Sequence, residues 1–223
     1  MKLKSLASLT KVKDPAWPEI KSWLEKAKNQ FTVLEPLEGQ GLATLYALQV
    51  TTHSSLGAIA LNTGGVVIDK GWLRLLGAGS VSMKGSLCNW NGLSDDNLIA
   101  ITLEDALIIG HDVLGGFFAL NGGTFDGPKG NVFYLVPDSL EWEDCEKPYT
   151  DFLNWVFNGD LALFYQDSRW SGWEHEMNNL SCDQGFYFAP PLWSNVKHGI
   201  RQKKIASMSE IWESYFTEEM KQS

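Results

Sequence analysis

Apolar residues recur at helical spacing near the start of the chain, where lysines and glutamates take the opposite side. Asp14 and Pro15 precede this pattern and have the residue types of a helix start, a capping side chain followed by proline at the first helical position. The pattern predicts an amphipathic helix over 15–28. Its apolar side consists of Trp17, Ile20, Trp23, Leu24 and Ala27.

Further helix signals follow at intervals. Residues 42–50 suit a helix or a strand, and both remain open. The apolar stretch after Ser54 predicts a helix capped by that serine and ended by Gly64 and Gly65. Helical spacing returns over 148–160, over 171–180 and, behind a capping box formed by Ser207 and Glu210, in a final helix through Met220.

Strand signals dominate the middle of the chain. Residues 66–77 alternate about Lys70 and Gly71 and predict a hairpin. From Leu98 to about Pro137, β-branched and aromatic residues between glycines predict three or four adjacent antiparallel strands. Residues 78–97 are rich in Gly, Ser, Asn and Asp and predict a long loop, which is either functional or disordered.

These signals predict an α+β fold with a mostly antiparallel central sheet and flanking helices. The chain of 223 residues is long enough for one domain with a sizeable core, so we expect a single domain over 1–223. Residues 1–13 are expected to form a mobile N-terminal segment. Residues 184–223, which begin with an edge strand stopped by prolines, are expected to form a strand–helix extension.

Composition narrows the class of protein. A formal net charge of −9 argues against nucleic-acid binding, because phosphate neutralisation needs a basic face. The apolar runs are too short for a membrane span or a secretory signal, and the three cysteines are widely spaced without a CxxC pair. These features predict a cytoplasmic protein with reduced thiols and no membrane association.

Common catalytic and cofactor motifs do not match. The loop after Gly122 has the glycine spacing of a phosphate loop, but Pro128 stands where the lysine belongs and lacks an N–H group. The four histidines are scattered without metal-ligand spacing, and the cluster at 174–176 places adjacent residues on different sides of a helix. No GxSxG motif occurs. We therefore expect no cofactor and no metal, and an enzyme is the less favoured class.

Two sets of residues remain as binding candidates. Residues 138–160 carry seven acids against the single Lys147, so this segment either keeps the protein soluble or attracts a cationic partner. Aromatic residues crowd the second half of the chain, where most belong to the core, but two tryptophans beside Arg169 are expected to be exposed anchors. The first candidate set is Asp138, Glu141, Glu143, Asp144, Trp170 and Trp173.

The second set would line a pocket beside the glycine-rich loops and consists of His111, Asp112, Asn121 and Asp126. His111 and Asp112 are neighbours, and neighbours in a strand face opposite sides. The favoured interpretation is therefore a strand end at which Asp112 bonds the turn. Similarly, the loop 121–130 is predicted to close a hairpin, with Gly122 and Gly123 supplying unusual backbone angles.

Three long stretches are specific enough to compare with known families. They are LQVTTHSSLGAIALNTGGVVIDKGWLRLLGAGS, GGFFALNGGTFDGPKGNVFYLVPDSLEWED and YTDFLNWVFNGDLALFY. Together they resemble an uncharacterised bacterial family catalogued as domain of unknown function 2625, over nearly all of residues 15–195. That family label carries no assigned activity, so the resemblance implies no catalytic residue.

A second resemblance concerns the order of elements. A glycine-bearing strand pair, an acidic turn and a closing helix are similar to the SUKH superfamily, also called Smi1/Knr4-like. The resemblance implies a SUKH-like fold. Many bacterial members are immunity proteins that bind and neutralise a toxin, and others are intracellular interaction modules. The long loop around Trp90 and the tail after Asp183 depart from the pattern.

Three functions follow as hypotheses. The first is a non-enzymatic, immunity-like module that binds a protein, with a basic toxin as the expected kind of partner, because an acidic surface attracts a basic one. The second is a small-molecule-binding protein or an enzyme with a pocket near the glycine-rich loops. The third is a self-associating structural protein, and the sequence leaves the oligomeric state open.

Overall fold

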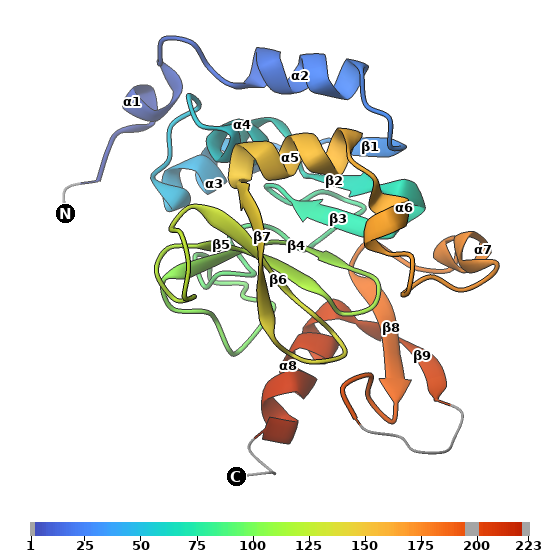
Figure 1. The fold of residues 1–223 in the computed structure, drawn as a ribbon. Helices are drawn as coiled ribbons and strands as arrows, with labels where there is room; N and C mark the ends of the chain where they lie inside the picture. Colours follow the sequence, from blue (N-terminus) through green and yellow to red (C-terminus); the bar gives the residue numbers. More distant parts are fainter. Residues whose placement is uncertain (1–2, 195–200, 220–223) are drawn as a thin grey trace.

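The computed structural model describes residues 3–194 and 201–219, and its centre is a seven-stranded antiparallel sheet (Figure 1). Each strand pairs with the next one along the chain, so the sheet is a simple meander. This confirms the predicted α+β class and the antiparallel sheet. The strands are β1 (Phe31–Leu34), β2 (Gly65–Ile68), β3 (Leu73–Leu76), β4 (Ala106–Asp112), β5 (Phe117–Asn121), β6 (Asn131–Leu135) and β7 (Trp142–Pro148).

Helices flank the sheet, and four of them pack together on one side of it (Figure 1). Helices α3 and α4 contact each other, and both α2 and α5 contact α4. In α5 the buried Phe152 and Val156 recur at helical spacing, as predicted, and Gly159 follows the helix end. The helices are α1 (Leu6–Thr10), α2 (Trp17–Glu25), α3 (Gln40–Leu48), α4 (Ser55–Asn62), α5 (Tyr149–Asn158), α6 (Leu161–Phe164), α7 (Trp173–Met177) and α8 (Met208–Glu219).

The C-terminal part adds a two-stranded sheet and a helix on the other side (Figure 1). Strands β8 (Gln184–Ala189) and β9 (Gln202–Ser207) pair antiparallel, and α8 packs against both. The predicted capping box is confirmed, because the amide of Glu210 donates to the Ser207 hydroxyl and the amide of Ser207 donates to the Glu210 carboxylate. Residues 197–204, a polar and basic stretch predicted as a connector, end within β9, while residues 197–200 and Met220 lie outside the described residues.

Two hydrogen bonds fix α8 to the rest of the chain. The indole N–H of Trp212 donates to the carbonyl oxygen of Ile101 at 2.8 Å. The hydroxyl of Tyr215 donates to the carbonyl oxygen of Gly115 at 2.7 Å, at the turn between β4 and β5. The ring of Trp212 also packs edge-on against Phe117, with ring centroids 4.8 Å apart. The C-terminal extension is therefore anchored to the end of the central strands.

The predicted helix starts and ends need two corrections. Helix α2 begins after Ala16, and Asp14 lies outside it with a left-handed φ of 54°, so the predicted capping by Asp14 is wrong. Helix α4 is capped by Ser54 as predicted but ends at Asn62, before the two glycines. A Cβ on Gly64 would lie 2.7 Å from the Glu35 carbonyl oxygen, so this glycine permits close packing of strands instead of ending a helix.

The strand predicted to start at Leu98 begins only at Ala106. In the described structure a long packed loop fills the chain between β3 and β4, over residues 77–105. This loop is ordered by its apolar residues, with Trp90 only 2% exposed against Trp212 and Phe117. Its Asn91 side chain forms hydrogen bonds with both the N–H and the carbonyl of Ile108, at 2.7 and 2.9 Å. The side-chain amide of Asn91 therefore satisfies the backbone hydrogen-bonding groups of Ile108 in β4, beyond the end of the neighbouring strand β3.

The buried apolar residues form one connected cluster that reaches from Ile20 to Tyr215. Trp72, Trp90 and Trp212 are among its largest members, which confirms that much of the aromatic content serves the core. Within the described ranges, no helix is long and apolar enough to cross a bilayer.

Candidate functional site

Asp112 closes the turn between β4 and β5. It is the last residue of β4 and is fully buried. Its carboxylate accepts hydrogen bonds from the backbone N–H groups of Leu114 and Gly116, at 2.8 and 3.0 Å, and from the hydroxyl of Tyr134, at 2.6 Å. The interpretation of this aspartate as a turn-bonding residue at a strand end is confirmed.

The burial of this group has electrostatic consequences. Burial raises the pKa of the Asp112 carboxyl, and the hydrogen bonds from Tyr134 and from the turn N–H groups offset part of that rise. Burial, together with the nearby Asp112, holds the pKa of both Tyr134 and Tyr165 well above the usual range of a phenol. Tyr134 therefore remains a proton donor to Asp112, and its oxygen keeps lone pairs that can accept a hydrogen bond.

Tyr134 forms part of the wall of a cavity of about 400 Å³. The cavity lies between β6 and β7, the connection from α6 to α7, and β8 with the loop after it. Five aromatic rings make up much of its surface. They belong to Tyr134, Phe164, Tyr165, Trp170 and Phe188.

Three carboxylates line the same cavity. Glu143 on β7 pairs in register with Tyr134 on β6, so the two side chains lie on the same face of the sheet. Asp138 belongs to the turn between these strands, and Asp167 to the segment after α6. All three are exposed to solvent. The described residues that line the cavity include no lysine, arginine, histidine or cysteine, so the charged side chains of its lining are all acidic.

The tryptophan of the cavity wall is held in place by polar contacts. The indole N–H of Trp170 donates to the Glu176 carboxylate at 2.6 Å. Lys203 of β9 lies with its Nζ 3.7 Å from the centre of the Trp170 ring and forms an ion pair with the same Glu176, at 2.6 Å. Because three groups fix one another, the Trp170 ring is preorganised in the wall.

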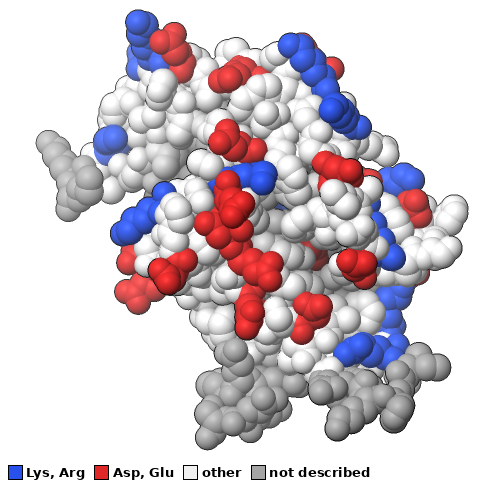
Figure 2. Space-filling model, in the orientation of Figure 1, with Lys and Arg blue, Asp and Glu red and all other residues white. Residues whose placement is uncertain are grey.

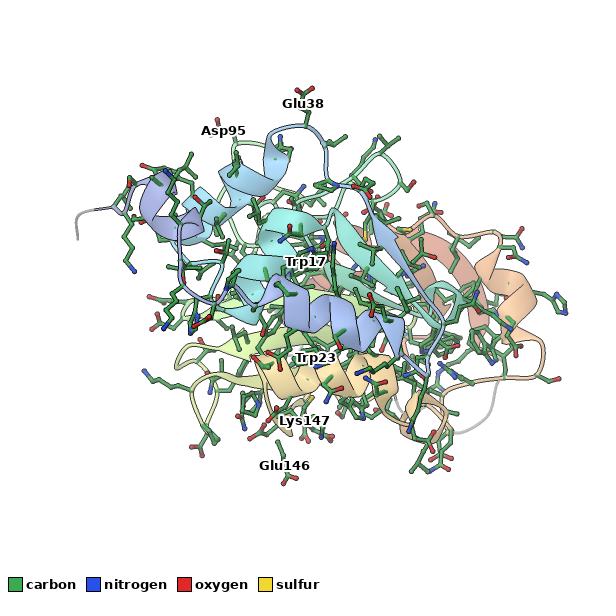
Figure 3. All side chains as sticks on the ribbon, turned by 90° about the horizontal axis from the view of Figure 1, so that it is seen from above. Trp17, Trp23, Glu38, Asp95, Glu146 and Lys147 are labelled. Carbon is green, nitrogen blue, oxygen red and sulfur yellow. The ribbon has the colours of Figure 1, made fainter. Side chains whose placement is uncertain are left out.

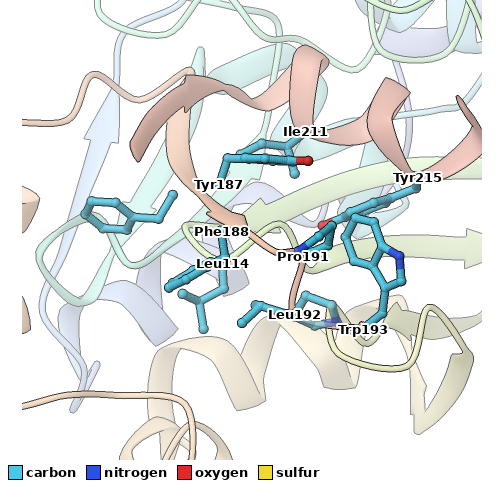
Figure 4. Close-up of a pocket in the computed structure, with 10 residues that line it drawn as sticks. Leu114, Tyr187, Phe188, Pro191, Leu192, Trp193, Ile211 and Tyr215 are labelled. Atoms are coloured by element: carbon cyan, nitrogen blue, oxygen red, sulfur yellow. The ribbon is translucent and has the colours of Figure 1, made fainter. Parts of the chain in front are cut away.

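A much smaller hollow lies beside this cavity and shares Leu114, Phe188 and Leu192 with it (Figure 4). Figure 4 shows these residues facing Ile211 and Tyr215 of α8. Its volume of about 10 Å³ is no larger than one water molecule needs. This hollow is a packing seam through which the C-terminal extension closes one side of the larger cavity.

A third depression, of about 490 Å³, lies near the start of α6 and includes Asp69 and Arg169 in its lining. These two charged groups form an ion pair with each other, and the Arg169 guanidinium also lies over the rings of Trp72 and Trp173. Asp69 and Arg169 are therefore already engaged within the chain, and the described lining of this depression has no aromatic ring, which leaves the cavity lined by Tyr134 as the better candidate site.

Comparison with known proteins places the chain in a family. Residues 6–211 match the family described as protein of unknown function DUF2625. This chain belongs to the DUF2625 family. It is 36% identical to the uncharacterized protein YbfG of Escherichia coli (strain K12) over 214 residues, which cover 96% of each chain. It is 34% identical to an uncharacterized protein of Haemophilus influenzae (strain KW20) over 221 residues, which cover 98% of this chain and 96% of the other. No solved structure matches it.

In this DUF2625 protein, half of the first candidate set gathers at the cavity. Asp138, Glu143 and Trp170 line it. Glu141 lies in the turn outside the lining, and Asp144 is engaged with the side-chain amide of Asn131 at 3.1 Å.

The remaining member of that set, Trp173, is only 9% exposed. It packs edge-on against Trp72, with ring centroids 4.9 Å apart, and under the guanidinium of Arg169. The expectation that Trp173 is an exposed anchor is therefore wrong. Flanking charge indicated exposure, but here the flanking arginine stacks on the ring and helps to bury it.

The second candidate set is not assembled into one site. His111 and Asp112 lie at one end of β4, whereas Asn121 pairs with Ala106 at the other end. Asn121 is used by its own loop, where its side chain accepts from the N–H of Gly123 at 2.9 Å and donates to the carbonyl of Phe125 at 3.1 Å. This pattern confirms the predicted hairpin-closing loop over 121–130, in which Asp126 is exposed. Gly123 has the predicted unusual backbone angle, a φ of 144°, but Gly122 does not, so that part of the prediction is wrong.

His111 is fully buried beside Trp90 and Phe117. Neither of its ring nitrogens forms a hydrogen bond of normal geometry. Burial, and secondarily the charge of Arg74 on the neighbouring strand, lowers the pKa of His111 well below its usual value. His111 is therefore a neutral core residue that does not reach the cavity.

The sequence interpretation missed several residues of the DUF2625 cavity, chiefly Tyr134, Tyr165, Asp167 and Ser168. Tyr134 has a polar end between the apolar Phe133 and Leu135 of β6, and that was the available signal. The others lie in the connection after α6, whose position depends on tertiary packing. Among the described residues, no group of three His, Cys, Asp or Glu side chains is arranged to hold a metal ion.

Proposed function

We propose that this DUF2625 protein is a non-enzymatic binding module whose acidic face engages a basic protein partner. The observation that carries the proposal is the cavity lined by five aromatic rings and three carboxylates, without a cationic residue among its described lining. Aromatic side chains are the typical anchors of binding surfaces, and carboxylates select for positive charge.

The surroundings of the cavity extend this charge. Acidic side chains gather down the middle of one face of the molecule, over the position of β7 in Figure 1 (Figure 2). Strand β7 is the edge of the sheet, and its Glu143 and Glu146 are exposed. Charges on an edge strand prevent pairing with another sheet, and the same field accelerates encounter with a basic partner.

The lining residues also favour binding over catalysis. Nucleophilic and acid–base catalysis require a nucleophile or base within hydrogen-bond reach of a bound substrate. No histidine or cysteine is among the described residues that line the cavity, and Asp112 is committed to three hydrogen bonds behind Tyr134. The groups of the lining that could act as bases are the three carboxylates, and all three are exposed to solvent.

The SUKH-like order of elements supports an immunity-like role in particular. A strand pair joined by a glycine-rich loop leads into an acidic turn and then into α5, the order in which the superfamily places its elements. Members of that superfamily include immunity proteins, so we propose a basic toxin as the partner. Because one fold serves many functions, the acidic face has more weight in this proposal than the order of elements.

A small cationic molecule is the second candidate occupant. The cavity volume of about 400 Å³ lies within the range of small-ligand sites, roughly 300–1,000 Å³. Self-association through the final helix has less support, because Trp212 and Tyr215 of α8 are buried within the chain itself.

The proposal is tested by identifying and reconstituting a complex. The tagged protein is used to capture partners from the cells that encode it, and the captured protein is then purified and titrated against the wild type. We expect a stoichiometric complex with a basic protein whose affinity falls as salt is raised from about 50 to 500 mM, because screening shortens the range of the charges. An affinity that does not change with salt would contradict the proposal.

Matched variants locate the interface. The triple variant Asp138→Asn, Glu143→Gln, Asp167→Asn removes the three carboxylates of the cavity and should weaken the complex at least about tenfold, roughly 1.4 kcal/mol. The control removes two charges, at Glu38 and Asp95, which lie at the opposite edge of the molecule from Glu146 and Lys147 (Figure 3), so the losses are compared per charge removed. An equal loss in both variants would show that only net charge matters.

A further inference from the structure

The polar groups of the cavity share one property, which is that they accept hydrogen bonds. The three carboxylates are acceptors. The Tyr134 hydroxyl already donates its hydrogen bond to Asp112, so that toward a ligand only its lone pairs remain. A ligand that satisfies these groups must therefore be a donor of several hydrogen bonds, and the negative charge requires it to be a cation.

Tyr165 points to the same conclusion. Its side chain is 1% exposed and lines the cavity, and its hydroxyl forms no hydrogen bond of normal geometry. Its interaction with Asp112 is the weaker of the two tyrosine contacts with that carboxyl. Because that oxygen is shielded from solvent and interacts with Asp112, the part of Tyr165 that lines the cavity is its ring, a surface that attracts cations.

The chain already places cations on the rings of this wall. The Arg169 guanidinium lies 5.2 Å from the centre of the Tyr165 ring, and the Lys203 ammonium lies 3.7 Å from the centre of the Trp170 ring. These contacts are cation–π interactions, which strengthen when the ring is shielded from water. Since these rings also face the cavity, a cation inside it would meet surfaces of the same kind.

We propose that the cavity receives the guanidinium group of an arginine side chain presented by the partner. Arginine fits better than lysine because its planar group stacks on aromatic rings and offers five donors to carboxylates that lie at different points of the rim. This inference rests on the proposed function and names the residue type that would occupy its site.

The test uses small probes in place of the unknown partner. The full chain is titrated with N-acetyl-arginine methylamide, the corresponding lysine compound, and the citrulline compound, which keeps the shape of arginine without its charge. Binding is followed by the NMR signal of the Trp170 indole N–H. We expect the arginine probe to bind with a dissociation constant on the order of 1–10 mM, and the citrulline probe at least about tenfold more weakly.

A pair of variants assigns the binding to this cavity. Glu143→Gln should weaken binding of the arginine probe about fivefold, because it removes a carboxylate of the lining. Glu146→Gln, which makes the same change on the same strand but outside the lining, should change it less than about twofold. Both glutamates are exposed, so both variants should fold. Equal binding of arginine and citrulline, stronger binding of lysine, or equal effects of the two variants would overturn the inference.

The outcomes distinguish a failure of the guanidinium inference from a failure of the proposed protein-binding function. If the arginine probe does not bind while a purified partner still depends on Asp138, Glu143 and Asp167, the acidic face is a binding surface and the guanidinium inference is wrong. If the probe binds with the expected selectivity but no protein partner forms a complex, the guanidinium site stands and the protein-binding function is wrong.

Discussion

The hydroxyl of Tyr134 donates a 2.6 Å hydrogen bond to the carboxylate of Asp112, and this contact joins the cavity wall to the end of β4. The contact needs a glycine beside it. A Cβ on Gly116 would lie 2.2 Å from the Tyr134 hydroxyl and 2.5 Å from the carboxylate. The turn between β4 and β5 therefore requires both the buried Asp112 carboxylate and a glycine at position 116, where a side chain would not fit.

Removal of the Tyr134 hydroxyl should destabilise the protein. In Tyr134→Phe the Asp112 carboxylate loses one of its three hydrogen bonds in a buried place, so the free energy of unfolding should fall by about 1–3 kcal/mol. Chemical denaturation followed by circular dichroism measures the difference. Tyr165→Phe is the matched control, because the Tyr165 hydroxyl forms no normal hydrogen bond and its loss should change stability by less than about 0.5 kcal/mol. Equal losses in the two variants would contradict this account.

His111 should make stability depend on pH. Its pKa in the folded protein lies well below 6.5, so below pH 6.5 the unfolded chain binds more protons than the folded one. The free energy of unfolding should therefore decrease as pH falls below about 6.5, with a contribution of up to about 1.4 kcal/mol per pH unit. The raised pKa of Asp112 works in the opposite direction, because it favours the folded state as pH falls.

The variant His111→Leu separates these two contributions. It has no ring to protonate but keeps Asp112, so the free energy of unfolding of the wild type relative to the variant should fall as pH is lowered from 7 to 5. Denaturation curves at a series of pH values measure that difference. A difference that stays constant with pH would mean that His111 is not a neutral buried group.

Gly115 should be far less tolerant of a side chain than Gly130. Both glycines have a left-handed backbone, with φ of 88° and 89°. A Cβ on Gly130 would meet nothing within 4 Å, so Gly130→Ala should cost only the backbone strain, about 1–2 kcal/mol. A Cβ on Gly115 would lie 2.1 Å from the Tyr215 hydroxyl, so Gly115→Ala should cost more and should loosen α8. Thermal unfolding compares the variants, and similar melting temperatures would show that α8 does not depend on this contact.

Much of the fold could be predicted because local chemistry and tertiary structure agree. The capping box at Ser207 and the hairpin of β5 and β6 depend on contacts within a few residues. Strand β7 was missed because its exposed charges do not resemble a strand, and these charges are tolerated because it is an edge. The strand expected from Leu98 does not form for the opposite reason. Its apolar pattern resembles a strand, but apolar residues there are buried as part of a loop.

The candidate site could be predicted only in part. The acidic turn at Asp138 and the candidate Trp170 are visible as local runs of charge and aromatic residues. The tyrosines that form the inner wall could not be predicted in this way. A tyrosine in an apolar segment has the pattern of a core residue until the partner of its hydroxyl is known. That partner, Asp112, is 22 residues from Tyr134 and 53 from Tyr165, on the far side of turns that bring them together.

Crosslinking in the cells that encode this protein shows whether the acidic cavity is a docking site for a basic protein. A photo-reactive amino acid is placed at Ser168, an exposed residue that lines the cavity, and in a control protein at Glu38, which lies at the opposite edge of the molecule from Glu146 and Lys147. The account predicts that illumination joins one basic protein to the Ser168 position and not to the Glu38 position. Crosslinks that are equal at both positions, or absent at Ser168, would contradict it.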